Sequence, residues 1–339
     1  MVPAANRQSV RGSLAPFLNT VRCGDSAKML KDVPSGSVDL VITSPPYYQQ
    51  RDYGGGRTGN EGHVEAYIDS IMQVFEQCVR VTKETGSIVF NMGDKYSQGS
   101  LMLVPYRFAI RATGSGAVRL VNNTTWVKTN PTPRQFKRRL VSGTEPFFHF
   151  AKSDSYCYNI DDFQRPETGV KKPPENTRVG EGYKKLIESS ELEPVQKRRA
   201  QKALQEAIEE TKSGAIAGFR MKIRGIHSPA FGGQAGGRQI QLRDNGFTII
   251  RMRGNPIKRD VIHHQVESIR WNAHPAIYPV GIIAEFIRLL TPKGAVVLDP
   301  YMGSGTTGVA ARSLGRSFMG IELNAGYCRA ANKRISAAG

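Results

Sequence analysis

The sequence contains few cysteines, and none is arranged to hold a metal ion. Cys23, Cys78, Cys157 and Cys328 are far apart, and no Cys-x-x-Cys pair or His pair at ligand spacing is present. Scattered cysteines of this kind are typical of buried free thiols in a reducing compartment. We therefore expect no metal site. The absence of a Pro-Cys pair also disfavours chemistry that requires a covalent thiolate.

Long hydrophobic runs are also absent. No apolar run reaches the ~18 residues that a transmembrane helix requires. The segment Met1–Arg7 lacks the apolar core of a secretory signal peptide. We expect a cytoplasmic protein with no membrane partner. The 339 residues suffice for one large domain or two ordinary ones.

Negative charge is in short supply. The chain has 29 Asp and Glu against 47 Lys and Arg, a formal net charge of +18. A field of this sign concentrates polyanions and speeds association with them. Composition does not identify the polyanion, because a basic surface that only aids solubility would give the same sum.

A glycine-rich segment, Asp299–Gly308, follows the apolar run Ala295–Leu298 and precedes a helix-compatible stretch. Strand, glycine turn and helix is the geometry that surrounds an anionic group with backbone N–H groups. The segment is not Gly-x-Gly-x-x-Gly, and no Lys follows it as in a phosphate-binding loop, so pyrophosphate is not the favoured ligand. The absence of Gly-x-Gly-x-x-Gly also disfavours an NAD-dependent oxidoreductase. A second strand, 316–321, ends at Glu322, where nucleotide-binding α/β folds hold a ribose diol. The alternative is a tight turn that requires glycine only for its backbone.

A second motif, Thr43–Tyr47, follows the apolar strand Val38–Ile42. Pro45 and Pro46 fix the backbone, which suits either a rigid polar site or an ordinary turn. Tyr47 could stack on a substrate or anchor the core. Two such motifs, each at the end of an apolar strand, predict one site for a nucleoside cofactor and a flat aromatic substrate.

Strands that alternate with helices predict an α/β fold with a doubly wound, mostly parallel sheet. Periodicity predicts helices over 64–82, 101–112, 193–212 and 276–290, and strands over 87–92, 118–128 and 147–152. The stretch 161–265 is more polar and basic than the rest. Its alternating basic and apolar residues, followed by a glycine-rich loop over 232–238, suit a segment that lies along DNA.

The two motifs and their order resemble the S-adenosylmethionine-dependent amino DNA methyltransferases, in the permuted group with the catalytic motif first. The resemblance covers about 21–159 and 266–335. It implies a methyltransferase Rossmann-like fold with an inserted target-recognition region. The implied catalytic half is 1–160, the recognition region 161–265 and the cofactor-binding half 266–339. Ser44, where adenine-modifying relatives usually carry Asp or Asn, resembles the cytosine-N4 branch of restriction-modification enzymes.

The resemblance implies site-specific methyl transfer from S-adenosylmethionine to the N4 of cytosine in double-stranded DNA, with base flipping. A companion restriction endonuclease is a possible partner. Adenine N6 is the alternative target, and an inactive DNA-binding protein with the same fold is the more distant alternative. The intact Ser44–Tyr47 and Gly303–Thr306 motifs argue against loss of activity.

Four residues are expected to act in catalysis: Ser44, Pro45, Pro46 and Tyr47. The Ser44 hydroxyl and the Pro45 carbonyl can accept hydrogen bonds from an amino group. The expected cofactor-binding residues are Asp25, Thr43, His274, Pro275, Ile277, Tyr278, Asp299, Met302, Gly303, Ser304, Gly305, Thr306, Glu322 and Leu323. Asp25 could equally cap a helix. Gly305 is expected to let the ligand approach the turn closely.

Basic residues in two parts of the chain are candidates for DNA binding. They are Arg134, Lys137, Arg138 and Arg139 in one loop, and Arg198, Arg199, Arg238 and Arg243 in the recognition region. For each group the alternative is a solvated charged surface.

Overall fold

The computed structural model describes residues 13–50, 58–131, 136–164, 179–216, 218–227, 242, 244–252, 258–267 and 278–338. The chain forms two compact units. The larger consists of Met1–Phe163 with Arg259–Gly339, and the smaller is Gln164–Lys258. The smaller unit begins later and ends earlier in the sequence than the expected recognition region, 161–265. No helix of the described residues is long and apolar enough to cross a membrane.

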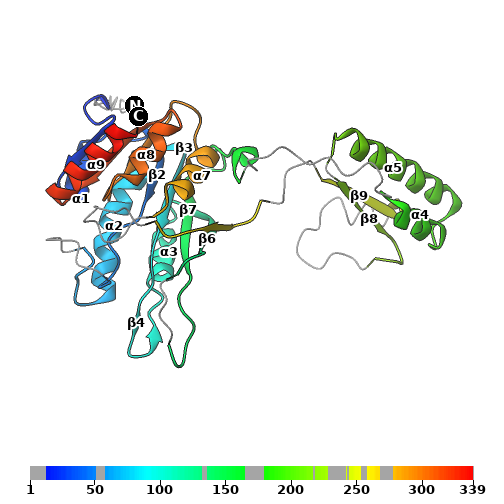
Figure 1. Cartoon of the computed structure of the whole chain (residues 1–339), viewed down its shortest axis with the longest axis horizontal. Helices are drawn as coiled ribbons and strands as arrows, with labels where there is room; N and C mark the ends of the chain where they lie inside the picture. The colour runs from blue at the N-terminus through cyan, green and yellow to red at the C-terminus, as the bar shows by residue number, and fades with distance from the viewer. Residues whose placement is uncertain are drawn as a thin grey trace, which may run out of the picture. The chain divides into compact units, whose positions relative to one another are not determined.

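An eight-stranded sheet forms the centre of the larger unit (Figure 1). Its strands, in spatial order, are β1 (Thr20–Cys23), β12 (Ser317–Glu322), β11 (Val296–Asp299), β2 (Val38–Thr43), β3 (Thr82–Asn91), β7 (Thr144–Ala151), β6 (Arg119–Lys128) and β10 (Val261–His264). β7 is antiparallel to both of its neighbours, and the other pairs are parallel. The predicted doubly wound, mostly parallel α/β fold is confirmed.

Helices cover both faces of this sheet, because its central strands are apolar on both sides. Leu40 and Ile42 of β2 belong to one core, and Val41 between them belongs to the other. The core with Val41 includes residues of η1 (Leu30–Asp32), α2 (Val64–Val81) and α3 (Val104–Gly114), and α1 (Ser26–Met29) packs beside it. The opposite core includes residues of α7 (Val280–Leu290), α8 (Thr306–Ser313) and α9 (Ala325–Ala337). A short helix, η2 (Ile160–Asp162), follows β7.

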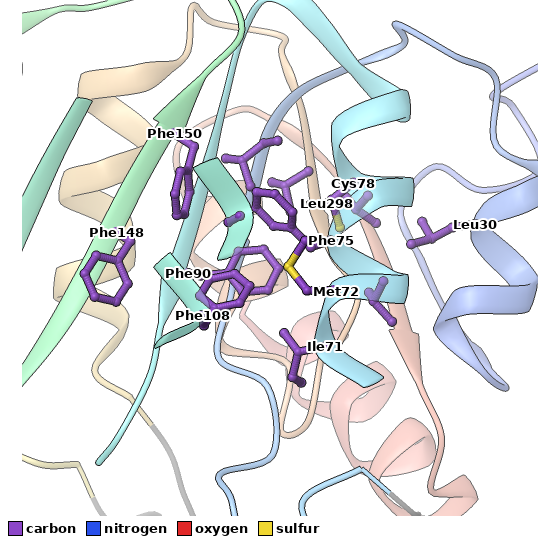
Figure 2. Close-up of a cluster of buried hydrophobic side chains, with 14 of the residues drawn as sticks. Leu30, Ile71, Met72, Phe75, Cys78, Phe90, Phe108, Phe148, Phe150 and Leu298 are labelled. Carbon is purple, nitrogen blue, oxygen red and sulfur yellow. The ribbon is translucent and has the colours of Figure 1, made fainter. Parts of the chain in front are cut away.

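Aromatic side chains fix α2 and α3 against the sheet (Figure 2). The Phe75 ring of α2 lies 5.4 Å from Phe90, 5.4 Å from Phe108 and 5.2 Å from Phe150, each time edge to face. Such pairs add to the stabilisation that apolar burial provides. This packing anchors α2 and α3 on β3 and β7.

Two predicted helices start later in the structure than in the sequence analysis. Leu101 lies in β5 (Ser100–Leu101), which pairs with β4 (Tyr96–Ser97), and Leu103 has a left-handed backbone, so α3 begins only at Val104. Pro105 lies in its first turn, where a missing backbone N–H is tolerated. α7 begins at Val280 because the extended Pro279 precedes its first turn.

The smaller unit has its own core. It consists of α4 (Glu181–Glu188), α5 (Pro194–Ser213) and an antiparallel pair, β8 (Gly218–Ile223) and β9 (Phe247–Met252). Ala200, Leu204, Ala207 and Ile208 of α5 are buried at helical spacing, whereas Val195 is exposed. The glycine-rich segments at 54–56 and 232–238 lie outside the described residues.

Candidate active site

The two sequence motifs meet at the centre of the sheet. β2 and β11 are neighbouring parallel strands, so Thr43 and Asp299 lie together at their carboxyl ends. The Thr43 hydroxyl donates a hydrogen bond to Asp299 Oδ1 at 2.5 Å, across 256 positions of sequence. The chain leaves β2 and β11 toward opposite sides of the sheet. Ligands of open α/β sheets bind at such a switch point.

Asp299 is fully buried and organises the turn that follows it. Its carboxylate also accepts hydrogen bonds from Tyr278 Oη at 3.0 Å, Thr307 Oγ1 at 2.6 Å and the Tyr301 N–H at 3.0 Å. Burial raises the pKa of Asp299, and the hydrogen bonds that it accepts oppose the rise. Neither Asp299 nor Thr43 is among the described residues of the cavity wall. Their geometry fits positioning of the turn better than direct contact with a ligand.

The turn after Asp299 depends on glycines with positive φ. Gly303 has φ 52° and Gly305 has φ 85°, directly before α8. A side chain at Gly305 would meet Ala331 of α9 at 3.1 Å, so this glycine is required for packing and backbone conformation. The expected role of Gly305, close approach of the ligand, has no support in this geometry.

Arg334 of α9 is a part of this region that the sequence analysis missed. Its Nη1 donates to the Ser304 carbonyl at 3.2 Å and to Thr306 Oγ1 at 2.9 Å. Arg334 therefore fixes the turn from the side of α9. No motif includes it, because it reaches the turn only through the packing of α9.

A cavity of about 890 Å³ opens at this end of the sheet. Eight of the expected cofactor-binding residues line it: Asp25, Tyr278, Met302, Gly303, Ser304, Thr306, Glu322 and Leu323. Asp25 also caps α1 by accepting from the Lys28 N–H at 3.0 Å, so both of its expected roles are compatible with the geometry. His274, Pro275 and Ile277 lie outside the described residues.

Ser44, Pro45, Pro46 and Tyr47 line the same cavity. The Ser44 hydroxyl donates to Tyr47 Oη at 3.1 Å. Tyr47 Oη in turn lies 2.8 Å from Asn91 Oδ1 and 2.9 Å from Glu145 Oε2. Glu145 forms an ion pair with Lys128, and both side chains are largely buried, 13% and 19% exposed. A chain of hydrogen bonds thus leads from Ser44 to a carboxylate.

The strand directions explain why these groups converge. Asn91 and Lys128 are the last residues of β3 and β6, and Glu145 is the second residue of the antiparallel β7 between them. An antiparallel strand begins where its neighbours end. The sequence analysis assigned no role to the three residues. For Glu145, one signal was a carboxylate at the start of an otherwise apolar strand.

Backbone contacts hold the motif itself. The Pro46 carbonyl accepts a hydrogen bond from Tyr67 Oη of α2 at 2.9 Å. The Tyr47 ring lies against the backbone of Gly93, where an added Cβ would approach two ring carbons to 2.5 Å. The hydrogen bond to the Pro46 carbonyl and the contact with Gly93 together restrict the position of the Tyr47 ring.

The candidate DNA-binding residues lie in both units. Lys137 and Arg138 are exposed, and the Arg139 guanidinium lies on the cavity wall. Arg198 and Arg199 are exposed on α5 of the smaller unit. Arg134, Arg238 and Arg243 lie outside the described residues. Within the described ranges, no group of His, Cys, Asp or Glu could hold a metal ion.

Comparison with known proteins identifies the family. The N6/N4 DNA methylase profile matches residues 38–333. The chain belongs to this DNA methylase family. Type II methyltransferase M.SfiI of Streptomyces fimbriatus is 25% identical, over 90% of this chain and 88% of M.SfiI.

Solved structures of DNA methyltransferases share the fold. The cytosine-N4-specific PvuII DNA methyltransferase superposes with a TM-score of 0.57 at 18% identity, covering 94% of this chain and 90% of that one. The Thermus thermophilus protein TTHA0409, solved with S-adenosyl-L-methionine, gives 0.51 at 20% identity, covering 94% and 95%. These structures show that the fold is shared, whereas membership of the N6/N4 DNA methylase family identifies the chain as a DNA methyltransferase that uses S-adenosylmethionine.

The residues at the glycine turn fit this cofactor. Glu322 accepts from the Gly303 N–H and the Asn324 N–H, each at 2.8 Å, and each carboxylate oxygen keeps a lone pair for a ribose hydroxyl. Burial raises the pKa of Glu322. The Tyr301 hydroxyl on the cavity wall is buried without a hydrogen-bond partner among the described residues. Such a group favours a polar ligand.

Proposed function

We propose that this DNA methyltransferase modifies the exocyclic N4 of cytosine. The supporting observation is the hydrogen-bond chain from Ser44 through Tyr47 to Glu145 on the cavity wall. Because the Ser44 proton is committed to Tyr47, the Ser44 oxygen can offer lone pairs to a substrate. An amino group that donates to such an acceptor becomes more pyramidal, and its own lone pair becomes available.

S-adenosylmethionine, held by the glycine turn and Glu322, supplies an electrophilic methyl group. The chain's own residues then act on the acceptor. Ser44 and the Pro45 carbonyl accept hydrogen bonds from the amino group, and the Tyr47 ring offers a face for the base. Pro45 and Pro46 keep this backbone fixed, so the alignment costs no entropy at the moment of reaction.

The amino nitrogen must also lose a proton, and the same chain of hydroxyls gives that proton a path. As the N–H bond breaks, Ser44 takes the proton and passes its own to Tyr47, which passes its own to Glu145 Oε2. The carboxylate beside Lys128 thus becomes a neutral acid and the base stays uncharged. Glu145 lines the cavity, from which solvent can remove the proton after product release.

Cytosine is favoured over adenine because Ser stands where adenine-modifying relatives usually carry Asp or Asn. Mass spectrometry of nucleosides from duplex DNA treated with the protein and S-adenosylmethionine tests this directly. N4-methylcytosine is expected. N6-methyladenine without N4-methylcytosine would overturn the assignment.

We further propose that the smaller unit selects the DNA sequence, and that the base is extruded from the duplex into the cavity. The unit has a separate core and exposes Arg198 and Arg199. Their replacement by Ala should weaken binding to every sequence and reduce its salt dependence, as expected for phosphate contacts. A companion endonuclease would spare only DNA that is methylated at the shared site. Full resistance to an endonuclease encoded beside the gene, after expression of this chain, would support that partnership.

A further inference from the structure

Next to the proposed substrate cavity, the loop between β6 and β7 carries apolar side chains that are exposed in part or almost completely. Leu140 is 90% exposed, and Phe136 and Val141 are 40% and 37% exposed. A leucine left in water forgoes the free energy that its burial would supply. We call Phe136, Leu140 and Val141 the apolar tip.

The apolar tip is held in place by a folded turn. Phe136 and Arg139 form a β-bridge, and the Arg139 guanidinium lies 3.4 Å from the Phe136 ring centre and 3.9 Å from that of Tyr96. Tyr96 belongs to β4, which extends from the sheet beside this loop (Figure 1). Cation–π contacts of this kind stabilise a fixed loop conformation. Leu140, the next residue, is therefore presented outward by a supported turn.

The surroundings of the apolar tip indicate its partner. Phe136, Arg139 and Val141 line the cavity that also contains Ser44 and Glu145. Lys137 and Arg138 beside it are exposed cations. An apolar tip that is flanked by cations and lies on the wall of the cavity is complementary to duplex DNA, where phosphates flank stacked bases.

We propose that the apolar tip, with Leu140 foremost, inserts into the base stack and fills the space that the extruded base leaves. Proteins that distort DNA use apolar side chains in this way, and the contact offsets part of the free-energy cost of unstacking the bases. This inference rests on base extrusion as part of the proposed function. It adds a physical role for residues outside both sequence motifs.

The decisive variant is Leu140→Ala, which shortens the tip without touching the Arg139 turn. Two fluorescent duplexes serve as probes: one fully paired, and one with an abasic position opposite the target cytosine, which lowers the cost of extrusion. For the paired duplex, Leu140→Ala should reduce both binding, measured by fluorescence anisotropy, and single-turnover methylation at least tenfold. For the abasic duplex, both should remain within about threefold of the parent.

Ile110→Ala is the matched control, because Ile110 is an exposed aliphatic residue on α3, 74% exposed. It should leave both probes unchanged. Equal losses of Leu140→Ala on both probes, or no loss, would overturn the insertion. A changed sedimentation coefficient with unchanged DNA binding would assign the apolar tip to contact between two copies of the chain. If Leu140→Ala weakens binding to the paired duplex but not to the abasic one, and the parent protein methylates neither, the insertion is supported and the proposed function is refuted.

Discussion

Replacing Tyr47 with Phe removes one oxygen atom from the centre of the site. The ring keeps its place against Gly93, while Ser44 loses the acceptor for its proton and Glu145 keeps its ion pair with Lys128. The lost hydrogen bond involves a carboxylate, and such bonds contribute about 1.5–3 kcal/mol. At about 1.4 kcal/mol per factor of ten, methyl transfer should slow by roughly 10–150-fold.

Single-turnover methylation with saturating DNA isolates this step, and calorimetry should show cofactor affinity within twofold of the parent. Tyr48→Phe is the matched control, since Tyr48 is buried next in sequence and its hydroxyl donates to the Gly62 carbonyl at 3.4 Å. Glu145→Gln should slow the step by a similar factor, and the double variant should be no slower than the worse single one, because the two groups act as one chain. A Tyr47→Phe rate within threefold of the parent would refute the relay.

Four further outcomes are expected. Ser44→Ala should slow turnover, because it removes about 2–4 kcal/mol of transition-state stabilisation, and calorimetry should show unchanged cofactor affinity. Undiminished methylation would exclude Ser44 from the mechanism. Gly305→Val should lower the free energy of unfolding by about 2–4 kcal/mol in urea melts, since it combines positive φ with the clash against Ala331; a stable variant that fails to bind cofactor would contradict this. Glu322→Gln should weaken cofactor binding at least tenfold, because the amide has one acceptor oxygen in place of two; unchanged affinity would remove the ribose role. Burial lowers the pKa of His149 to about 4 from 6.5, so the contribution of this residue to stability should be complete above pH 6.5 and fall by about 3 kcal/mol toward pH 4; the slope of stability against pH over this range should therefore be smaller for His149→Gln in acid titrations.

The central architecture could be predicted because its signal is local. β2 alternates Leu40 and Ile42 with Val41 between two cores, and such a strand is apolar on both faces. The helix starts were harder. Leu101 was predicted to be helical but lies in β5, which pairs with β4 over only two residues. A pairing this short has no periodic pattern in the sequence.

The site was predictable only where its chemistry is contiguous in sequence. Ser44–Tyr47 and the glycine turn each lie within one strand-to-loop transition, so composition pointed to them. Lys128 and Glu145 meet across two strands, and their pairing depends on β7 running against its neighbours. Single-sequence patterns do not encode that direction. Gly305 has a packing role that its motif did not indicate, because a side chain there would meet Ala331 of the helix behind it.

The bond between Thr43 and Asp299 has a consequence for biosynthesis. β2 is a central strand, yet its partner β11 leaves the ribosome some 256 residues later. At about 5–20 residues per second, one edge of β2 waits roughly 13–50 s for its neighbour. An unpaired apolar edge of this kind invites pairing with another nascent chain. Slow translation or overexpression should therefore produce aggregates rather than a partially active enzyme, and no chain terminated before β11 can have a working catalytic centre.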